Sequence, residues 1–137
     1  MSGALTTWGR SVMVNSVFRP EAAPALGRLW VALTVSVPVA TDTGQSLAEP
    51  GASSYERSPY GVGSYYWNLT GPGQMINSRT VDWVSPTDDW GQVTGWALCT
   101  ESTSGMAVAF GPLQRAMTIT IGMRLRIPPG AMRLSLL

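Results

Sequence analysis

The sequence has no histidine and no lysine, and Cys99 is its one cysteine. Without histidine there is no imidazole general base, no Ser-His-Asp triad and none of the common zinc sites. A lone cysteine cannot form a disulfide within the chain, and without a histidine partner it is a poor nucleophile. Its neighbours Ala97 and Leu98 instead predict a buried thiol. Neither standard spacing of a glycine-rich phosphate-binding loop occurs, so the sequence lacks the usual residues of an active site.

Charge is scarce as well. Charged residues make up 12% of the 137 residues, with a net charge of +1, and that is about half the usual share. Such a surface suits burial against neighbours in an oligomer or a larger assembly, and a neutral surface rich in serine and threonine is the alternative. No basic cluster is present, so nucleic acid is not an expected partner. The longest apolar run, Leu29–Ala40, is interrupted by polar residues and Pro38. We therefore expect no membrane span and no signal peptide.

Hydrophobic spacing predicts one helix, at about residues 4–18. Leu5, Trp8 and Val12 recur at three and four residues, which places them on one apolar stripe. Ser2 or Thr6 can cap the start, and Pro20 ends the helix because proline cannot continue it. We expect the stripe to lie on the open face of a sheet.

Alternating apolar and polar residues predict a series of strands in the rest of the chain. They are Arg28–Val37, Val62–Leu69, Arg79–Val84, Val93–Cys99, Met106–Phe110, Ala116–Ile127 and Met132–Leu136. Val93–Cys99 and Met106–Phe110 are expected to form an antiparallel pair. A long variable loop is expected at about residues 40–54. The pattern predicts one mainly β domain over residues 1–137: an antiparallel β-sandwich or barrel with one short N-terminal helix.

The acidic residues are candidates for a catalytic or metal site. Asp88 and Asp89 lie in a turn, and Glu101 follows the next strand. A glycosidase needs two carboxyl groups that face each other, whereas neighbouring residues point apart. The spaced acidic ladder of a calcium loop is also missing. Side chains that accept backbone N–H groups in a turn are the better interpretation, so we expect no catalytic residue, no metal and no cofactor.

Six tryptophans raise the possibility of sugar stacking. Trp8, Trp83 and Trp96 lie on apolar faces, and core positions are the better interpretation for them. Trp30 points away from the main apolar face of its strand, and Trp67 lies in a mixed aromatic cluster, so both are candidates for a subunit interface. The residues predicted to make subunit contacts are Trp30, Leu47, Arg57, Tyr65 and Trp67.

A series of short motifs gives a resemblance to a known family. They are Trp30–Thr34, Tyr55-Glu56-Arg57, Asn77, Val81-Asp82-Trp83, Trp90–Thr94, Gly105, Gly122–Ile127 and Gly130-Ala131-Met132. In this order they resemble the small virion proteins of tailed bacteriophages that are often labelled phage tail fibre proteins. The sequence departs from the family at Met123, where aspartate is frequent, and in the loop between Pro38 and Tyr55.

The resemblance implies a non-enzymatic structural protein of the phage particle, made in the host cytoplasm and located on the virion. We expect a minor capsid or decoration protein, bound as a homo-oligomer, with a trimer favoured, to the major capsid protein or other virion proteins. The alternative is a tail-fibre or baseplate component that binds a host receptor or glycan. A hydrolase that uses only Asp88, Asp89 or Glu101 is the third hypothesis.

Overall fold

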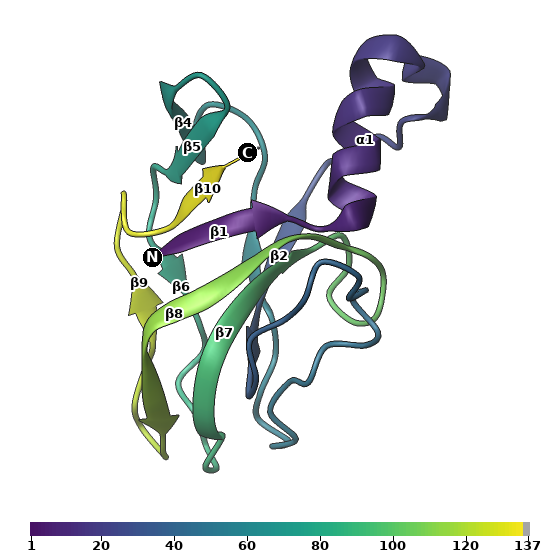
Figure 1. Ribbon diagram of the computed structural model, residues 1–137. Helices are drawn as coiled ribbons and strands as arrows, with labels where there is room; N and C mark the ends of the chain where they lie inside the picture. Colours follow the sequence, from purple (N-terminus) through teal and green to yellow (C-terminus); the bar gives the residue numbers. More distant parts are fainter. Residues whose placement is uncertain (136–137) are drawn as a thin grey trace.

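Ten strands and one α-helix form the regular structure of residues 1–135, the part of the chain that the computed structural model describes (Figure 1). The helix α1 spans Thr7–Phe18, and a 3-10 turn, η1, follows at Pro20–Ala22. The strands are β1 (Ser2–Leu5), β2 (Leu29–Thr34), β3 (Ser58–Tyr60), β4 (Trp67–Gly71), β5 (Gln74–Asn77), β6 (Val81–Asp82), β7 (Gly91–Cys99), β8 (Ala107–Ile119), β9 (Arg126–Ile127) and β10 (Arg133–Ser135).

Eight of these strands form one curled sheet, a half-barrel, in the order β3-β2-β7-β8-β1-β10-β5-β4 (Figure 1). The strands β6 and β9 form a separate ribbon. The mainly β fold with one short N-terminal helix is confirmed. One pair departs from the predicted antiparallel arrangement, because β1 runs parallel to β10. The first and last strands of the described chain therefore lie side by side in the middle of the sheet.

At β2 and β7 the sheet is covered on both faces. In β2, Val31 and Leu33 belong to the large core, whereas Ala32 between them belongs to a small cluster with Ala97 and Cys99. This is the alternation expected of a strand whose successive side chains point to opposite faces. The ribbon β6–β9 contributes to the large core, whose fully buried large side chains include Val81, Trp83, Val93, Trp96, Leu98, Ile119 and Met132. The predicted core positions of Trp83 and Trp96 are confirmed, whereas Trp8 is only partly buried and packs against the edge of the core.

The helix α1 begins at Thr7, not at residue 4, because Ala4 and Leu5 pair with β8 as part of β1. The predicted cap is confirmed at Thr6, whose hydroxyl accepts the Gly9 N–H at 2.9 Å. Only Gly9 and Val12 of the helix are buried. The expectation that its whole apolar stripe lies on the sheet was wrong, since the outer half of α1 projects beyond the sheet (Figure 1).

Several predicted strands extend beyond those of the structure. The segment Ala116–Ile127 alternates without interruption, yet β8 ends at Ile119 and β9 begins only at Arg126. Gly122 between them has a φ of 82°, a left-handed conformation that turns the chain and leaves Ile121 65% exposed. The segment Val62–Leu69 becomes strand only from Trp67, where β4 begins a hairpin with β5. Strands β1, β3 and β5 were not predicted.

Candidate interaction surface

The structure separates the five predicted contact residues into three kinds. Arg57 and Trp67 are buried within the chain, at 5% and 8% exposure. Trp30 and Leu47 are partly buried, and Tyr65 is 59% exposed. Contact of any of them with a neighbouring subunit stays a prediction. Arg57 and Trp67, however, are buried by contacts within this chain.

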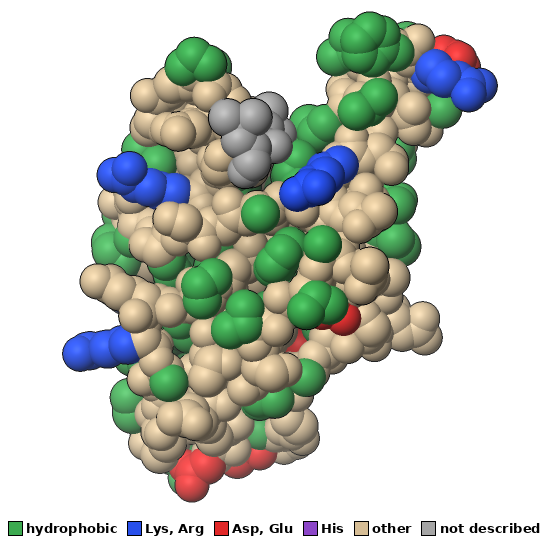
Figure 2. Space-filling model, in the orientation of Figure 1, with side chains coloured by type: hydrophobic (Ala, Val, Ile, Leu, Met, Phe, Trp, Pro, Cys, Tyr) green, Lys and Arg blue, Asp and Glu red, His purple; other side chains and the backbone are tan. Residues whose placement is uncertain are grey.

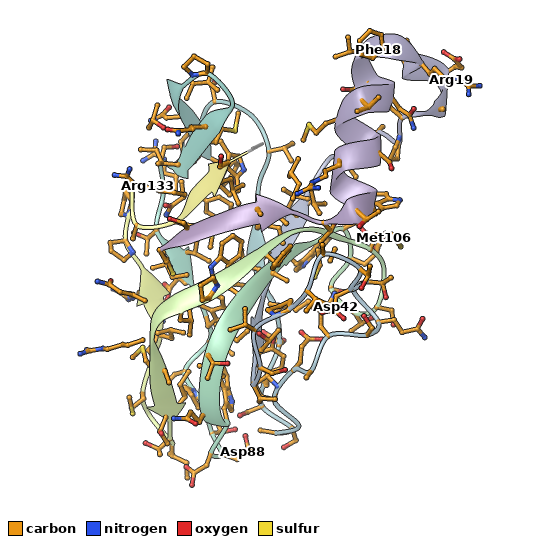
Figure 3. All side chains as sticks on the ribbon, in the orientation of Figure 1. Phe18, Arg19, Asp42, Asp88, Met106 and Arg133 are labelled. Atoms are coloured by element: carbon orange, nitrogen blue, oxygen red, sulfur yellow. The ribbon has the colours of Figure 1, made fainter. Side chains whose placement is uncertain are left out.

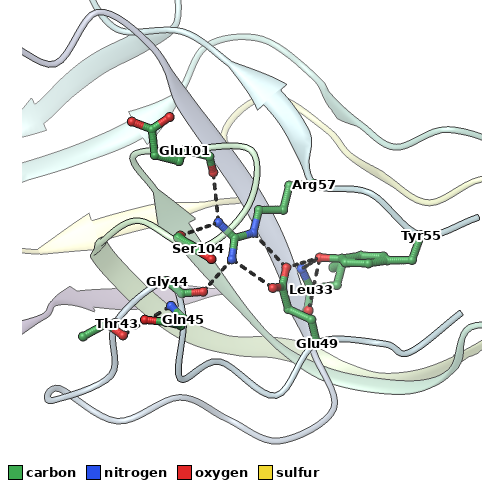
Figure 4. Close-up of polar contacts among 9 residues, drawn as sticks. All are labelled: Leu33, Thr43, Gly44, Gln45, Glu49, Tyr55, Arg57, Glu101 and Ser104. Carbon is green, nitrogen blue, oxygen red and sulfur yellow. Dashed lines mark hydrogen bonds and ion pairs between the residues drawn. The ribbon is translucent and has the colours of Figure 1, made fainter. Parts of the chain in front are cut away.

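Arg57 lies at the centre of a buried polar network (Figure 4). Its guanidinium donates to both carboxylate oxygens of Glu49, each at 2.9 Å. It also donates to three backbone carbonyl oxygens, those of Gly44 at 2.6 Å, Glu101 at 2.9 Å and Ser104 at 3.0 Å. Burial lowers the pKa of Arg57, but the hydrogen bonds with Glu49 and the charge effects of neighbouring groups together outweigh it, so that the pKa is raised. One side chain thus fastens the loop at residues 40–54 to the turn between β7 and β8.

Tyr55 extends the same network towards β2. Its hydroxyl donates to Glu49 at 2.8 Å and accepts the Leu33 N–H at 3.0 Å. Burial raises the Tyr55 pKa well above its usual value, and the negative charge of Glu49 raises it further. The motif Tyr55-Glu56-Arg57 is therefore a structural element, since its first and third side chains share one carboxylate.

The raised pKa of Tyr55 predicts alkaline instability. The folded protein binds this proton more tightly than the unfolded chain, whose tyrosines titrate near pH 10. The contribution to stability is complete below that pH and is lost as the pH rises above it. We expect the free energy of unfolding, measured with urea between pH 10 and 11.5, to fall less steeply in Tyr55→Phe, by roughly 1 kcal/mol per pH unit. Tyr65→Phe, which removes an exposed phenol, is the control. An unchanged slope in Tyr55→Phe would contradict the assignment.

The remaining predicted contact residues lie on both sides of the sheet. The Trp67 indole N–H donates to the Gly61 carbonyl oxygen at 2.9 Å, so this ring is fixed inside the chain. Tyr65 stays at the surface, with the Arg79 guanidinium 3.7 Å from its ring centroid. Leu47 packs on the small cluster that contains Cys99. Burial raises the pKa of the Cys99 thiol to about 11, in agreement with the predicted inert, buried thiol.

The acidic residues act as turn acceptors, as predicted. Asp88 accepts the backbone N–H groups of Ser53 and Ser54 and both of their hydroxyls. The hydrogen bond from the Ser54 side chain is the main cause of the lowered pKa of Asp88. Asp89 accepts the Ile121 N–H at 3.0 Å.

These carboxylates cannot work as a pair with Glu101. Asp88 and Asp89 precede β7 and Glu101 follows it, and a strand of nine residues is roughly 30 Å long. Figure 3 shows this separation, with Asp88 and Met106 at opposite ends of β7. Within residues 1–135 no cluster of histidine, cysteine or acidic side chains could hold a metal ion.

An uncovered apolar surface lies at the outer end of α1. Val14, Val17 and Phe18 are 55%, 71% and 77% exposed, and hydrophobic side chains cover this end of the helix in Figure 2. Phe18 lies at the far end, next to the exposed Arg19 (Figure 3). The sequence contained a signal for this surface, because Val14 and Phe18 fall outside the predicted stripe and make the helix apolar around more of its circumference.

An apolar groove lies between the inner side of α1 and the β4–β5 hairpin. Its volume is about 530 Å³, and Met13, Leu69, Met75 and Leu134 are among its lining residues. None of the described residues that line it is charged. The outer end of α1 and this groove together give one chain both a projecting apolar group and an apolar recess.

Comparison with known proteins assigns the chain to a family. Residues 4–135 match the sequence profile described as podophage GP4 fiber I protein gp80. No curated protein matches the sequence. Among the described residues, no helix is long and apolar enough to cross a membrane. The predicted resemblance to a phage tail fibre and virion protein family is confirmed. The profile covers nearly all of the chain, which therefore belongs to the family of the podophage GP4 fiber I protein gp80.

Proposed function

We propose that this protein is a non-enzymatic fibre subunit of a tailed phage particle that assembles with further copies of itself through α1. The observation that carries the proposal is the uncovered end of the helix, where Val17 and Phe18 are 71% and 77% exposed. A soluble monomer rarely leaves large neighbouring apolar side chains on one projecting element. Burial of a Val or Phe side chain contributes about 1.5–3 kcal/mol, so covering this end in an assembly is strongly favourable.

The groove beside α1 supports a second copy as the partner. It is apolar and uncharged, and it is large enough for the Val17 and Phe18 side chains of a neighbour. Contact between a projection and a recess on different faces of one chain is heterologous. Such contacts form a ring where the rotation between neighbours closes, and a helical filament where it does not. We propose a ring of three, as the sequence led us to expect. The exposed Arg19 and Glu21, whose side chains approach within 3.7 Å, lie at the end of the helix as a polar rim.

The family description favours a fibre over the head surface as the position on the virion. Attachment to the major capsid protein as a head decoration is the other placement. Antibody labelling of intact particles in electron micrographs distinguishes them, with label expected on a fibre or the tail. Label distributed over the head would overturn the fibre placement and support decoration.

Assembly through α1 can be tested by changing its outer end. In size-exclusion chromatography with light scattering, the wild type is expected as a trimer and Val17→Asp as a monomer, because a buried unpaired carboxylate opposes association. Ile121→Asp is the matched control: Ile121 is 65% exposed but lies in the turn between β8 and β9, and this variant should remain trimeric. A monomeric wild type, or a Val17→Asp variant that keeps the wild-type mass, would contradict the proposal.

A further inference from the structure

A second groove lies where the start of α1 meets the end of the sheet. It has a volume of about 420 Å³ and lies against the loop at residues 24–27. Two indoles line it, those of Trp8 and Trp30, together with Arg28, Thr100 and Glu101. Both tryptophans are partly exposed. Its volume lies in the range of small-molecule sites, and its lining combines aromatic faces with a few polar groups.

The two charged side chains in this groove, Arg28 and Glu101, have no ion-pair partner among the described residues. Arg28 makes no hydrogen bond or ion pair with the described residues, and its guanidinium lies 5.9 Å from the Trp30 ring centroid. Glu101 uses its backbone carbonyl oxygen to bind Arg57, while its carboxylate points away from that network (Figure 4). Opposite charges therefore line one groove without pairing within the part of the chain that the structure describes. Each is available to a ligand.

We propose that this groove binds a neutral glycan, with Trp8 and Trp30 as its stacking faces. The apolar C–H faces of a sugar ring pack on an indole, a large flat surface that loses little conformational freedom on binding. Neighbouring hydroxyls can donate to the Glu101 carboxylate and accept from the Arg28 guanidinium, and hydrogen bonds to charged groups are the stronger kind. This binding activity is additional to the structural role proposed above.

The charge balance selects the class of ligand. Arg28 and Glu101 give the groove no net charge, so it has no electrostatic preference for an anionic or a cationic sugar. A ligand that both donates and accepts hydrogen bonds satisfies both groups, as the hydroxyls of a hexose or an N-acetylhexosamine do. An apolar segment of another protein bound in this groove would leave the Arg28 and Glu101 charges buried and unpaired, which costs free energy of binding.

The test uses the full chain and an array of neutral hexose, deoxyhexose and N-acetylhexosamine oligosaccharides, followed by titration of the best array ligand with tryptophan fluorescence as the readout. Binding to at least one neutral glycan is expected, and Trp30→Ala should weaken it by roughly tenfold or more. Glu101→Gln should weaken it by a smaller factor. Tyr65→Ala, which removes an exposed aromatic ring outside this groove, is the control and should bind like the wild type.

Three results would overturn the inference. They are the absence of binding to any neutral glycan on the array, binding only to anionic glycans, and binding that survives Trp30→Ala unchanged. Loss of the trimer in Trp30→Ala without any glycan binding would instead make the groove a subunit contact. The monomer expected from Val17→Asp should still bind glycan, so failure of the assembly proposal and failure of this one are distinguishable.

Discussion

Replacing Arg57 with alanine is expected to lower the free energy of unfolding by about 3 kcal/mol. Removing one partner of a buried ion pair typically costs 3–5 kcal/mol, because the other charge stays buried without compensation. Here the Arg57 side chain is 3% exposed and that of Glu49 is 21% exposed, so some solvation of Glu49 places the loss at the lower end. The carbonyl oxygens of Gly44, Glu101 and Ser104 also lose their donor. Urea unfolding followed by circular dichroism measures the change.

Arg115→Ala is the matched control for this prediction. Arg115 is exposed on β8 and makes no hydrogen bond or ion pair within the described residues, so its loss should change stability by no more than about 0.5 kcal/mol. The double variant Arg57→Ala with Glu49→Gln should be less destabilised than the sum of the two single changes, because the two side chains are coupled. Additive effects, or equal losses at Arg57 and Arg115, would show that the network contributes little.

Gly9→Ala is expected to destabilise the protein by about 2 kcal/mol, although alanine is normally the better helix former by about 1 kcal/mol. A Cβ atom at Gly9 would collide with the Val108 carbonyl oxygen of β8, which belongs to the backbone and cannot move away alone. Overpacking of this kind costs about 1–3 kcal/mol. The close approach also positions Thr6, whose hydroxyl donates to the Ala107 carbonyl oxygen at 2.6 Å. Thermal or urea unfolding measures both the sign and the size of the change in the free energy of unfolding.

The control for Gly9 is another glycine without this contact. A Cβ at Gly27 would meet no atom within 4 Å, and Gly27 has no left-handed φ. Gly27→Ala should be neutral or slightly stabilising, since it reduces the freedom of the unfolded chain. A stabilised Gly9→Ala protein would mean that α1 is free to move off β8 at no cost.

The parts of the fold that could be predicted are those in which a local sequence pattern is compatible with a single structure. The alternation in β2 and β7 followed from burial of one sheet face against the large core, and the capping hydroxyl of Thr6 followed from its place before the helix. Trp83 and Trp96 were assigned to the core because they lie on the apolar sides of their strands, and both are at most 1% exposed.

The features that could not be predicted depend on contacts between residues far apart in the sequence. Strand β1 has no alternation that marks it; it forms because β8 and β10 offer edges on both sides. The strand predicted over Ala116–Ile127 is interrupted because Gly122 adopts a left-handed φ, and the alternation of apolar and polar residues does not reveal this. Arg57 resembled an interface arginine because an isolated sequence does not show that Glu49 and three carbonyl oxygens converge on it. The glycan groove was missed for the same reason, since residues around 8, 28 and 101 meet only in the fold.

The parallel pairing of β1 with β10 has a mechanical consequence. Ser2, Gly3 and Ala4 pair with Arg133, Leu134 and Ser135, so tension between residue 1 and residue 135 pulls the two strands along their length in opposite directions. In this shear geometry the hydrogen bonds between them are strained together, whereas peeling would break them one after another. Tension applied between these two strands therefore loads the domain in shear rather than in peeling.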